Sequence, residues 1–126
     1  MVLTEVASLI KESIRSEDLA ARYGGEEFVV LLPDVEQKDA FEIAERIRTS
    51  IEQKDFVFEN QHMNVSISVG IAMYFGTVGM TAKKLVEQAD MALYESKNTG
   101  RNKTSIYAEP VPVAKPKRKS SKKAKK

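Results

Sequence analysis

Glycine and acidic residues that suit phosphate and metal chemistry cluster near residue 25, where residues 22–28 read Arg-Tyr-Gly-Gly-Glu-Glu-Phe. Gly24 and Gly25 carry no side chain, so the backbone N–H groups there can approach a phosphate or a base closely. Glu26 and Glu27 follow directly. Because successive strand residues face opposite sides, only one of these carboxylates is expected to face a metal ion. Taken alone, this short pattern could also be an ordinary hairpin that has acidic residues beside its turn and binds no ligand.

A β-hairpin is expected to position these residues. Residues 19–23 and 26–32 form two strand-like runs that are separated by Gly24 and Gly25. A two-residue Gly-Gly connection is a strong hairpin signal, because the tight turns that suit hairpins need positive φ angles.

Three amphipathic helices are predicted from apolar residues at helical spacing, over residues 2–15, 37–54 and 81–98. Thr81 is a suitable N-cap for the third helix, and Gly100 is a suitable stop after it. These helices are long enough to cover a small sheet.

The remaining elements are predicted to be strands. Residues 64–74 alternate apolar and polar side chains, which indicates a half-buried strand, and shorter strands are predicted at residues 56–59 and 104–107. His62 falls in a predicted polar turn and is assigned no role. The order of elements indicates an α+β fold, with helices flanking an antiparallel-rich central sheet.

Charge divides the chain into two parts. Residues 115–126 hold eight Lys or Arg and no acid, whereas the preceding residues hold 12 basic and 18 acidic side chains, a net charge of −6. The proline- and lysine-rich segment cannot bury enough apolar surface to fold. We therefore predict one domain over residues 1–108 and a disordered lysine-rich tail over residues 109–126.

Composition limits the kinds of site and location. The chain has no cysteine, which excludes disulfides, thiolate metal sites and thiol nucleophiles. No apolar run is long enough to span a bilayer and no secretory pattern is seen, so a cytoplasmic location is expected. The tail could attract nucleic acid or an anionic membrane by its charge, or it could serve only to keep the chain soluble.

Residues 18–32 resemble, without a gap, the GGEEF form of the signature of GGDEF domains, the catalytic units of diguanylate cyclases. Further segments similar to this family are residues 43–48, 65–72 and 89–94, with Lys97, Gly100, Arg101 and Asn102. The resemblance covers residues 3–107. It implies the nucleotide-cyclase-like version of the α+β fold.

The resemblance implies that two GTP molecules are condensed into cyclic di-GMP, with release of two pyrophosphates, across a homodimer interface. Glu26 would bind Mg²⁺ (or Mn²⁺) and take the proton of the attacking hydroxyl, and Gly24 and Gly25 would bring backbone close to the nucleotide. Lys97 and Arg101, four residues apart at a helix end, would contact the phosphates. Without the resemblance, these two residues would be a solvated basic helix end that suits the helix dipole.

A second site is implied by Arg15 and Asp18, an Arg-x-x-Asp pattern ahead of the signature. In the family this pattern binds the product, cyclic di-GMP, and inhibits the enzyme, and Arg46 matches a position that completes the site from a neighbouring subunit or surface. The alternative is an ordinary exposed ion pair, worth under about 1 kcal/mol.

The family also uses a first strand and a following segment, which are missing from this sequence. They supply a second metal-binding Asp, a phosphate-binding Lys and residues that bind the guanine edge. One interpretation, which we prefer, is that the sequence is a fragment of a longer protein in which a sensor or receiver domain precedes the GGDEF domain. The other is a short chain without catalysis, which binds cyclic di-GMP or acts as an interaction domain. We expect little or no turnover from these 126 residues alone.

Overall fold

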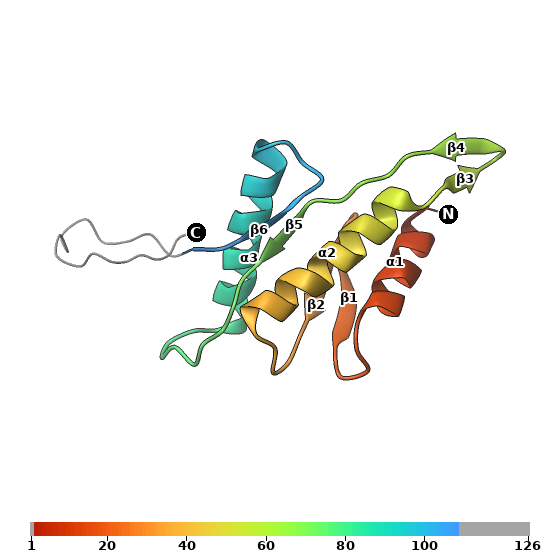
Figure 1. Ribbon diagram of the computed structural model, residues 1–126. Helices are drawn as coiled ribbons and strands as arrows, with labels where there is room; N and C mark the ends of the chain where they lie inside the picture. Colours follow the sequence, from red (N-terminus) through yellow and green to blue (C-terminus); the bar gives the residue numbers. More distant parts are fainter. Residues whose placement is uncertain (1, 109–126) are drawn as a thin grey trace.

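The computed structural model describes residues 2–108, so the predicted tail over residues 109–126 lies outside the described residues. The elements in chain order are α1 (Val2–Ser13), β1 (Leu19–Gly24), β2 (Glu27–Leu31), α2 (Gln37–Gln53), β3 (Phe56–Phe58), β4 (Gln61–Met63), β5 (Val69–Ile71), α3 (Ala82–Asn98) and β6 (Thr104–Ile106) (Figure 1). Helices and short sheets alternate along the chain, which confirms the predicted α+β class.

The predicted hairpin is present as the antiparallel pair β1–β2, but its turn lies one residue later than expected. Gly24 pairs with Glu27, so Gly25 and Glu26 are the two turn residues. The register shifts between Arg22 and Gly24, which leaves one extra residue on β1 as a bulge. Glu26 therefore belongs to the turn itself and not to the strand that follows.

The strands pair as three two-stranded sheets: β1–β2 and β3–β4 are antiparallel, whereas β5–β6 is parallel. The single long strand predicted over residues 64–74 is wrong in extent, because only Val69–Ile71 has a partner strand, β6. Val65 and Ile67 still pack against the core, which explains the alternation that suggested a strand. An alternating pattern reports burial, whereas a strand also requires a hydrogen-bonding neighbour.

The β3–β4 hairpin was not predicted, and it corrects the assignment of His62 to a turn. The turn residues are Glu59 and Asn60, both with positive φ angles (51° and 65°), and His62 lies in β4. The His62 Nδ1 atom is 2.9 Å from the carboxylate of Asp55, and both side chains are exposed. Here two non-glycine residues adopt the turn conformation that glycine usually provides.

The core lies between α1, α2 and the inner face of the β1–β2 hairpin. Its buried members are Val6 and Ile10 of α1, Ile43, Ile47 and Ile51 of α2, and Phe56 of β3. Ala20, Phe28 and Val30 of the hairpin pack against this cluster from one side. Figure 1 shows α1 and α2 in front of the hairpin, so the two helices cover a single face of it.

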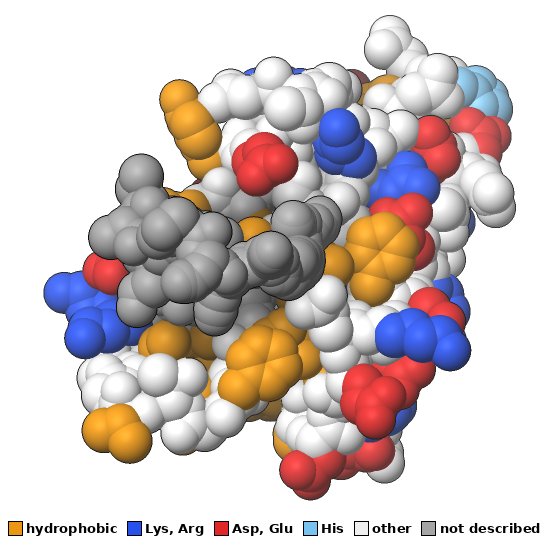
Figure 2. Space-filling view, turned by 60° about the vertical axis from the view of Figure 1, so that its left-hand side comes forward, with side chains coloured by type: hydrophobic (Ala, Val, Ile, Leu, Met, Phe, Trp, Pro, Cys, Tyr) orange, Lys and Arg blue, Asp and Glu red, His pale blue; other side chains and the backbone are white. Residues whose placement is uncertain are grey.

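The opposite face of the hairpin stays exposed in this structure. Leu19 and Leu31 are paired across the two strands, with 59% and 50% of their surface accessible, and Tyr23 is 60% accessible. Figure 2, which looks at the side of the molecule with α3, shows further hydrophobic side chains at the surface.

No helix within residues 2–108 is long and apolar enough to cross a membrane.

α3 packs on β5 and β6, and α2 also contacts these strands. The predicted N-cap is confirmed, since the Thr81 Oγ1 atom accepts a hydrogen bond of 3.1 Å from the backbone N–H of Lys84. At the other end of α3, Ser96 is fully buried and its hydroxyl donates to the carbonyl of Val69 at 2.9 Å. The Ser96 bond attaches the C-terminal part of α3 to β5.

Candidate functional site

The turn of the β1–β2 hairpin places three of the predicted site residues at the surface. Gly24, Gly25 and Glu26 are all exposed, and Gly25 has a φ angle of +45°. A Cβ atom built on Gly24 or Gly25 would meet no atom within 4 Å, so the backbone borders open space. This geometry leaves room for a phosphate or a base to approach the backbone.

Arg22 stabilises the turn from within the hairpin. Its guanidinium donates two hydrogen bonds to the carbonyl of Gly25, from Nε at 2.9 Å and from Nη2 at 2.5 Å. The carbonyl oxygen of Gly25 is thereby paired, while the Glu26 side chain is exposed and bonds to no other residue within 2–108. A charged group that satisfies a turn carbonyl in this way keeps the loop in one conformation.

The described residues offer one carboxylate at the turn apex. No group of three or more His, Asp or Glu side chains within residues 2–108 is arranged to hold a metal ion. Mg²⁺ keeps several waters and is usually held by one or two carboxylates together with substrate phosphates. Glu26 therefore fits a metal that arrives with a nucleotide, and does not fit a metal bound by the protein alone.

Lys97 and Arg101 lie at the C-terminal end of α3, and both are exposed. Arg101 lies beyond the helix, because α3 ends at Asn98, and it has a φ angle of +60°. The backbone N–H of Arg101 donates to the carbonyl of Ser96 at 2.9 Å. The loop after the helix, and not helical spacing, sets where Arg101 stands.

The two groups of predicted substrate-binding residues come from different elements. In Figure 1 the C-terminal end of α3 lies at the top of the molecule, whereas the hairpin lies behind α2. No hydrogen bond or ion pair between described residues joins Glu26 to Lys97 or Arg101. A single ligand that contacts both the hairpin turn and the C-terminal end of α3 would have to span the space between these two elements.

Arg15 and Asp18 lie at the opposite end of the hairpin and form a closely bonded pair. The Arg15 Nη2 atom is 2.6 Å from Asp18 Oδ1, and the backbone N–H of Arg15 donates to Asp18 Oδ2 at 2.8 Å. The Asp18 side chain has no accessible surface. Its hydrogen bond from Arg15 holds the pKa of the Asp18 carboxyl below the ordinary value, against the opposing effect of burial.

Further bonds hold the Arg15–Asp18 pair at the corner between α1 and β1. Arg15 Nη2 also donates to the carbonyl of Pro33 at 2.9 Å. The Arg46 guanidinium of α2 donates to the carbonyl of Ser13 from Nε at 3.1 Å and from Nη2. The structure therefore brings Arg15, Asp18 and Arg46 to one corner of a single chain, about 20 Å from the hairpin turn for a six-residue strand.

Comparison with known protein families identifies the family to which this chain belongs. Residues 1–103 match the family model described as "Diguanylate cyclase, GGDEF domain". The chain belongs to the GGDEF domain family. Its curated relatives include Diguanylate cyclase A of Treponema denticola, 46% identical over 114 residues, which make up 90% of this chain and 30% of that protein. Response regulator PleD of Caulobacter vibrioides is 42% identical over 103 residues, 80% of this chain and 22% of that protein.

Solved GGDEF structures have the same fold. The GGDEF domain of DgcB from Caulobacter crescentus, in complex with c-di-GMP, superposes with a TM-score of 0.78 at 31% identity, over 84% of this chain and 63% of that one. The active GGEEF domain of a diguanylate cyclase from Vibrio cholerae gives a TM-score of 0.74 at 30% identity, over 86% of this chain and 68% of that one. The GGDEF chain spans less than a third of the two curated relatives above.

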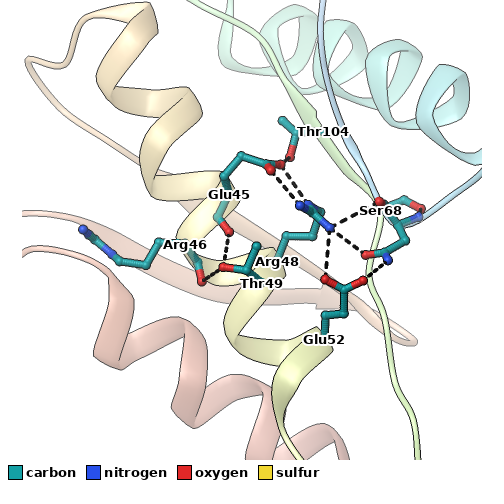
Figure 3. A network of polar contacts seen from close by, with 8 residues as sticks. Glu45, Arg46, Arg48, Thr49, Glu52, Ser68 and Thr104 are labelled. Atoms are coloured by element: carbon teal, nitrogen blue, oxygen red, sulfur yellow. Dashed lines mark hydrogen bonds and ion pairs between the residues drawn. The ribbon is translucent and has the colours of Figure 1, made fainter.

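Sequence reasoning missed one polar network of this GGDEF domain. On α2, Arg48 bonds to both Glu45 and Glu52, and Glu45 also accepts a bond from Thr104 of β6 (Figure 3). Arg48 and Glu52 both bond to Asn102, which lies in the loop after α3. The spacing of three and four residues between Glu45, Arg48 and Glu52 was a visible sign of a helical ion-pair cluster. The contacts to Asn102, which is 54 residues from Arg48 in the chain, left no such sign.

Proposed function

We propose that this GGDEF domain acts in the condensation of two GTP molecules into cyclic di-GMP, each domain of a homodimer presenting one GTP. The observation that carries the proposal is the exposed Gly24–Gly25–Glu26 turn, where open backbone and a free carboxylate lie side by side. The family match and the relatives named diguanylate cyclase support it.

In the proposed reaction, the 3′-hydroxyl oxygen of one GTP bonds to the α-phosphorus of the other. The bond from that phosphorus to the bridging oxygen breaks, and pyrophosphate leaves; a second such step closes the ring. Glu26 accepts the hydroxyl proton, and the backbone of Gly24 and Gly25 lies against the nucleotide. Lys97 and Arg101 balance the negative charge of the phosphates. A bound Mg²⁺ or Mn²⁺, held by Glu26 and phosphate oxygens, would neutralise further phosphate charge.

Calorimetric titration of GTP into the chain, with and without Mg²⁺, tests this assignment. We expect Mg²⁺ to strengthen binding, and Glu26→Gln to remove that Mg²⁺-dependent gain while keeping the size of the side chain. Glu87→Gln is the matched control, because Glu87 is an exposed acid of α3 away from the turn. Equal Mg²⁺-dependent gains in the parent and in Glu26→Gln would contradict the proposed role of Glu26.

The corner between α1 and β1 supports a second function, the binding of cyclic di-GMP. Arg15 and Asp18 bond to each other there, and Arg46 bonds to the nearby carbonyl of Ser13. A structural neighbour, the GGDEF domain of DgcB, was solved with c-di-GMP. The Asp18 carboxylate is buried under Arg15, so contact with a guanine edge requires Arg15 to release it. The guanidinium of Arg15 would then be available for a phosphate or a base.

Titration of cyclic di-GMP into the parent, Arg15→Ala and Glu26→Gln tests the second function. We expect Arg15→Ala to weaken binding and Glu26→Gln to leave it unchanged, since the two residues lie at opposite ends of the hairpin. Asp18→Ala is a further check on the same corner. If the parent binds no cyclic di-GMP, or if Arg15→Ala binds it as well as the parent does, product binding at this corner is wrong.

A further inference from the structure

The turn after α3 has a conformation that needs outside support. Three successive residues have positive φ angles: Gly100 at 121°, Arg101 at 60° and Asn102 at 47°. Glycine adopts such angles freely and Asn more readily than other residues, but Arg does so only at a conformational cost. Contacts made by neighbouring elements must therefore hold the turn in this form.

Asn102 receives those contacts from two elements. Its side-chain oxygen accepts from Arg48 Nη1 at 3.0 Å, and its side-chain nitrogen donates to Glu52 Oε2 at 2.6 Å. Its backbone N–H donates to Ser68 Oγ at 3.2 Å. Asn102 is thus bonded to α2 on one side and to the segment leading into β5 on the other.

Arg48 is itself held in a single orientation. Its Nε and Nη2 atoms donate to the two carboxylate oxygens of Glu45, at 2.9 and 2.7 Å, and only 15% of its side chain is accessible. Glu45 Oε2 also accepts from the hydroxyl of Thr104 at 2.7 Å. Because the guanidinium is a rigid planar fork, its bonds to Glu45 fix the direction of the bond to Asn102.

The network restrains the turn on both sides of its exposed residue. Asn102 and Thr104 are bonded to α2, and the backbone N–H of Arg101 is bonded to Ser96 of α3. The Arg101 side chain remains exposed and takes no part in the network. Its backbone is therefore held in place, while its guanidinium is available to a ligand.

We infer that Arg48 is a positioning residue that, through Asn102, holds the left-handed turn from which Arg101 projects. The inference rests on the proposed function in one respect only: that Arg101 contacts the phosphates of GTP. The order of the turn and the binding of GTP can be measured separately, so failure of one claim can be told from failure of the other.

Backbone order parameters from NMR relaxation test the positioning itself. In Arg48→Gln we expect the order parameter of Arg101 to fall from about 0.85 to about 0.6 or below, while residues in the middle of α3 keep their values. Arg48→Lys should behave similarly, because an ammonium cannot bond to Glu45 and Asn102 in the geometry of the fork. Lys38→Gln, which removes an exposed cation of the same helix, is the control.

A second variant keeps the test decisive if Arg48→Gln does not fold. Asn102→Gly removes the side chain that Arg48 holds and still permits the φ angle of 47°. We expect the same loss of order at Arg101. Unchanged order at Arg101 in the folded variants, or an equal loss throughout α2 and α3, would overturn the inference.

A double-mutant cycle on GTP binding in Mg²⁺ connects the turn to the proposed function. We expect Arg101→Ala to weaken binding about tenfold and Arg48→Gln about threefold. The combined variant should bind no more weakly than Arg101→Ala alone, because Arg48 acts only through Arg101. Additive effects would overturn the positioning role and leave the phosphate contact intact. No effect of Arg101→Ala would contradict the phosphate contact, and the order parameters would still decide the positioning.

Discussion

Gly70 of β5 lies directly against the backbone of α3 at Leu93. A Cβ atom built on Gly70 would stand 2.2 Å from the backbone nitrogen of Leu93 and 2.3 Å from the carbonyl oxygen of Ala89. Both are backbone atoms of a helix, so neither can rotate away. The absence of a side chain at Gly70 therefore sets how closely α3 packs on β5, and with it the position of the loop that carries Arg101.

Gly70→Ala is expected to lower the free energy of unfolding by about 1–3 kcal/mol, since the new methyl group must displace α3. Urea denaturation followed by circular dichroism measures the free energy of unfolding. Gly24→Ala is the control, because a Cβ there meets no atom within 4 Å. Equal stability of the two variants would mean that α3 does not approach β5 this closely.

Thr81 begins α3 by accepting a hydrogen bond from the backbone N–H of Lys84. Thr81→Ala is expected to cost about 1 kcal/mol of unfolding free energy, because that N–H loses its partner, whereas Thr81→Ser keeps the hydroxyl and most of the stability. Thermal denaturation of both variants checks this. If Thr81→Ser is destabilised as much as Thr81→Ala, the side-chain methyl group and not the cap is what matters.

Stability should also depend on pH through Glu45. The hydrogen bond from Arg48 lowers the pKa of the Glu45 carboxyl below its ordinary value of 4.5, and a bond from Thr104 adds to this against the effect of burial. A carboxyl with a lower pKa in the folded state stabilises the fold above its ordinary pKa, and this contribution is lost as the pH falls through the folded value. The free energy of unfolding should therefore be steady near neutral pH and decline below about pH 4.5.

Arg48→Gln provides the comparison for the pH measurement. The variant lacks the partner that lowers the pKa of Glu45, so its unfolding free energy should decline less steeply between about pH 4.5 and 3. Asp18 keeps its partner Arg15 and Glu45 keeps its bond from Thr104, so both still contribute to the acid dependence that remains. Parallel curves for the parent and Arg48→Gln would show that the Arg48–Glu45 bond does not lower this pKa.

Local patterns predicted the features that depend on neighbouring residues. Thr81 caps α3 as expected, and the three helical stripes correspond to the observed helices within two residues at either end. The hairpin was predicted, but its turn was placed one residue early, because the bulge in β1 and the bonds from Arg22 to Gly25 leave no pattern in the sequence. Predictions of this kind use only short-range information.

Features that join distant parts of the chain were not predictable from the sequence. The strand predicted over residues 64–74 was too long, because the extent of a strand depends on its pairing with β6 and not on its own alternating pattern. The positive φ angle of Arg101 depends on Asn102 and Arg48, which lie far apart in the sequence. The site residues themselves were named from the family resemblance, and their roles remain proposals.

Mapping the GTP site by NMR tests the central claim most directly. Amide chemical shifts are followed while GTP and Mg²⁺ are added to the chain. If the hairpin turn is the nucleotide site, the largest shifts will appear at Gly24, Gly25 and Glu26, with a second group at Lys97 and Arg101, and Glu26→Gln will reduce them. Binding of GTP that shifts other residues and leaves Gly24 and Gly25 unchanged would contradict the account.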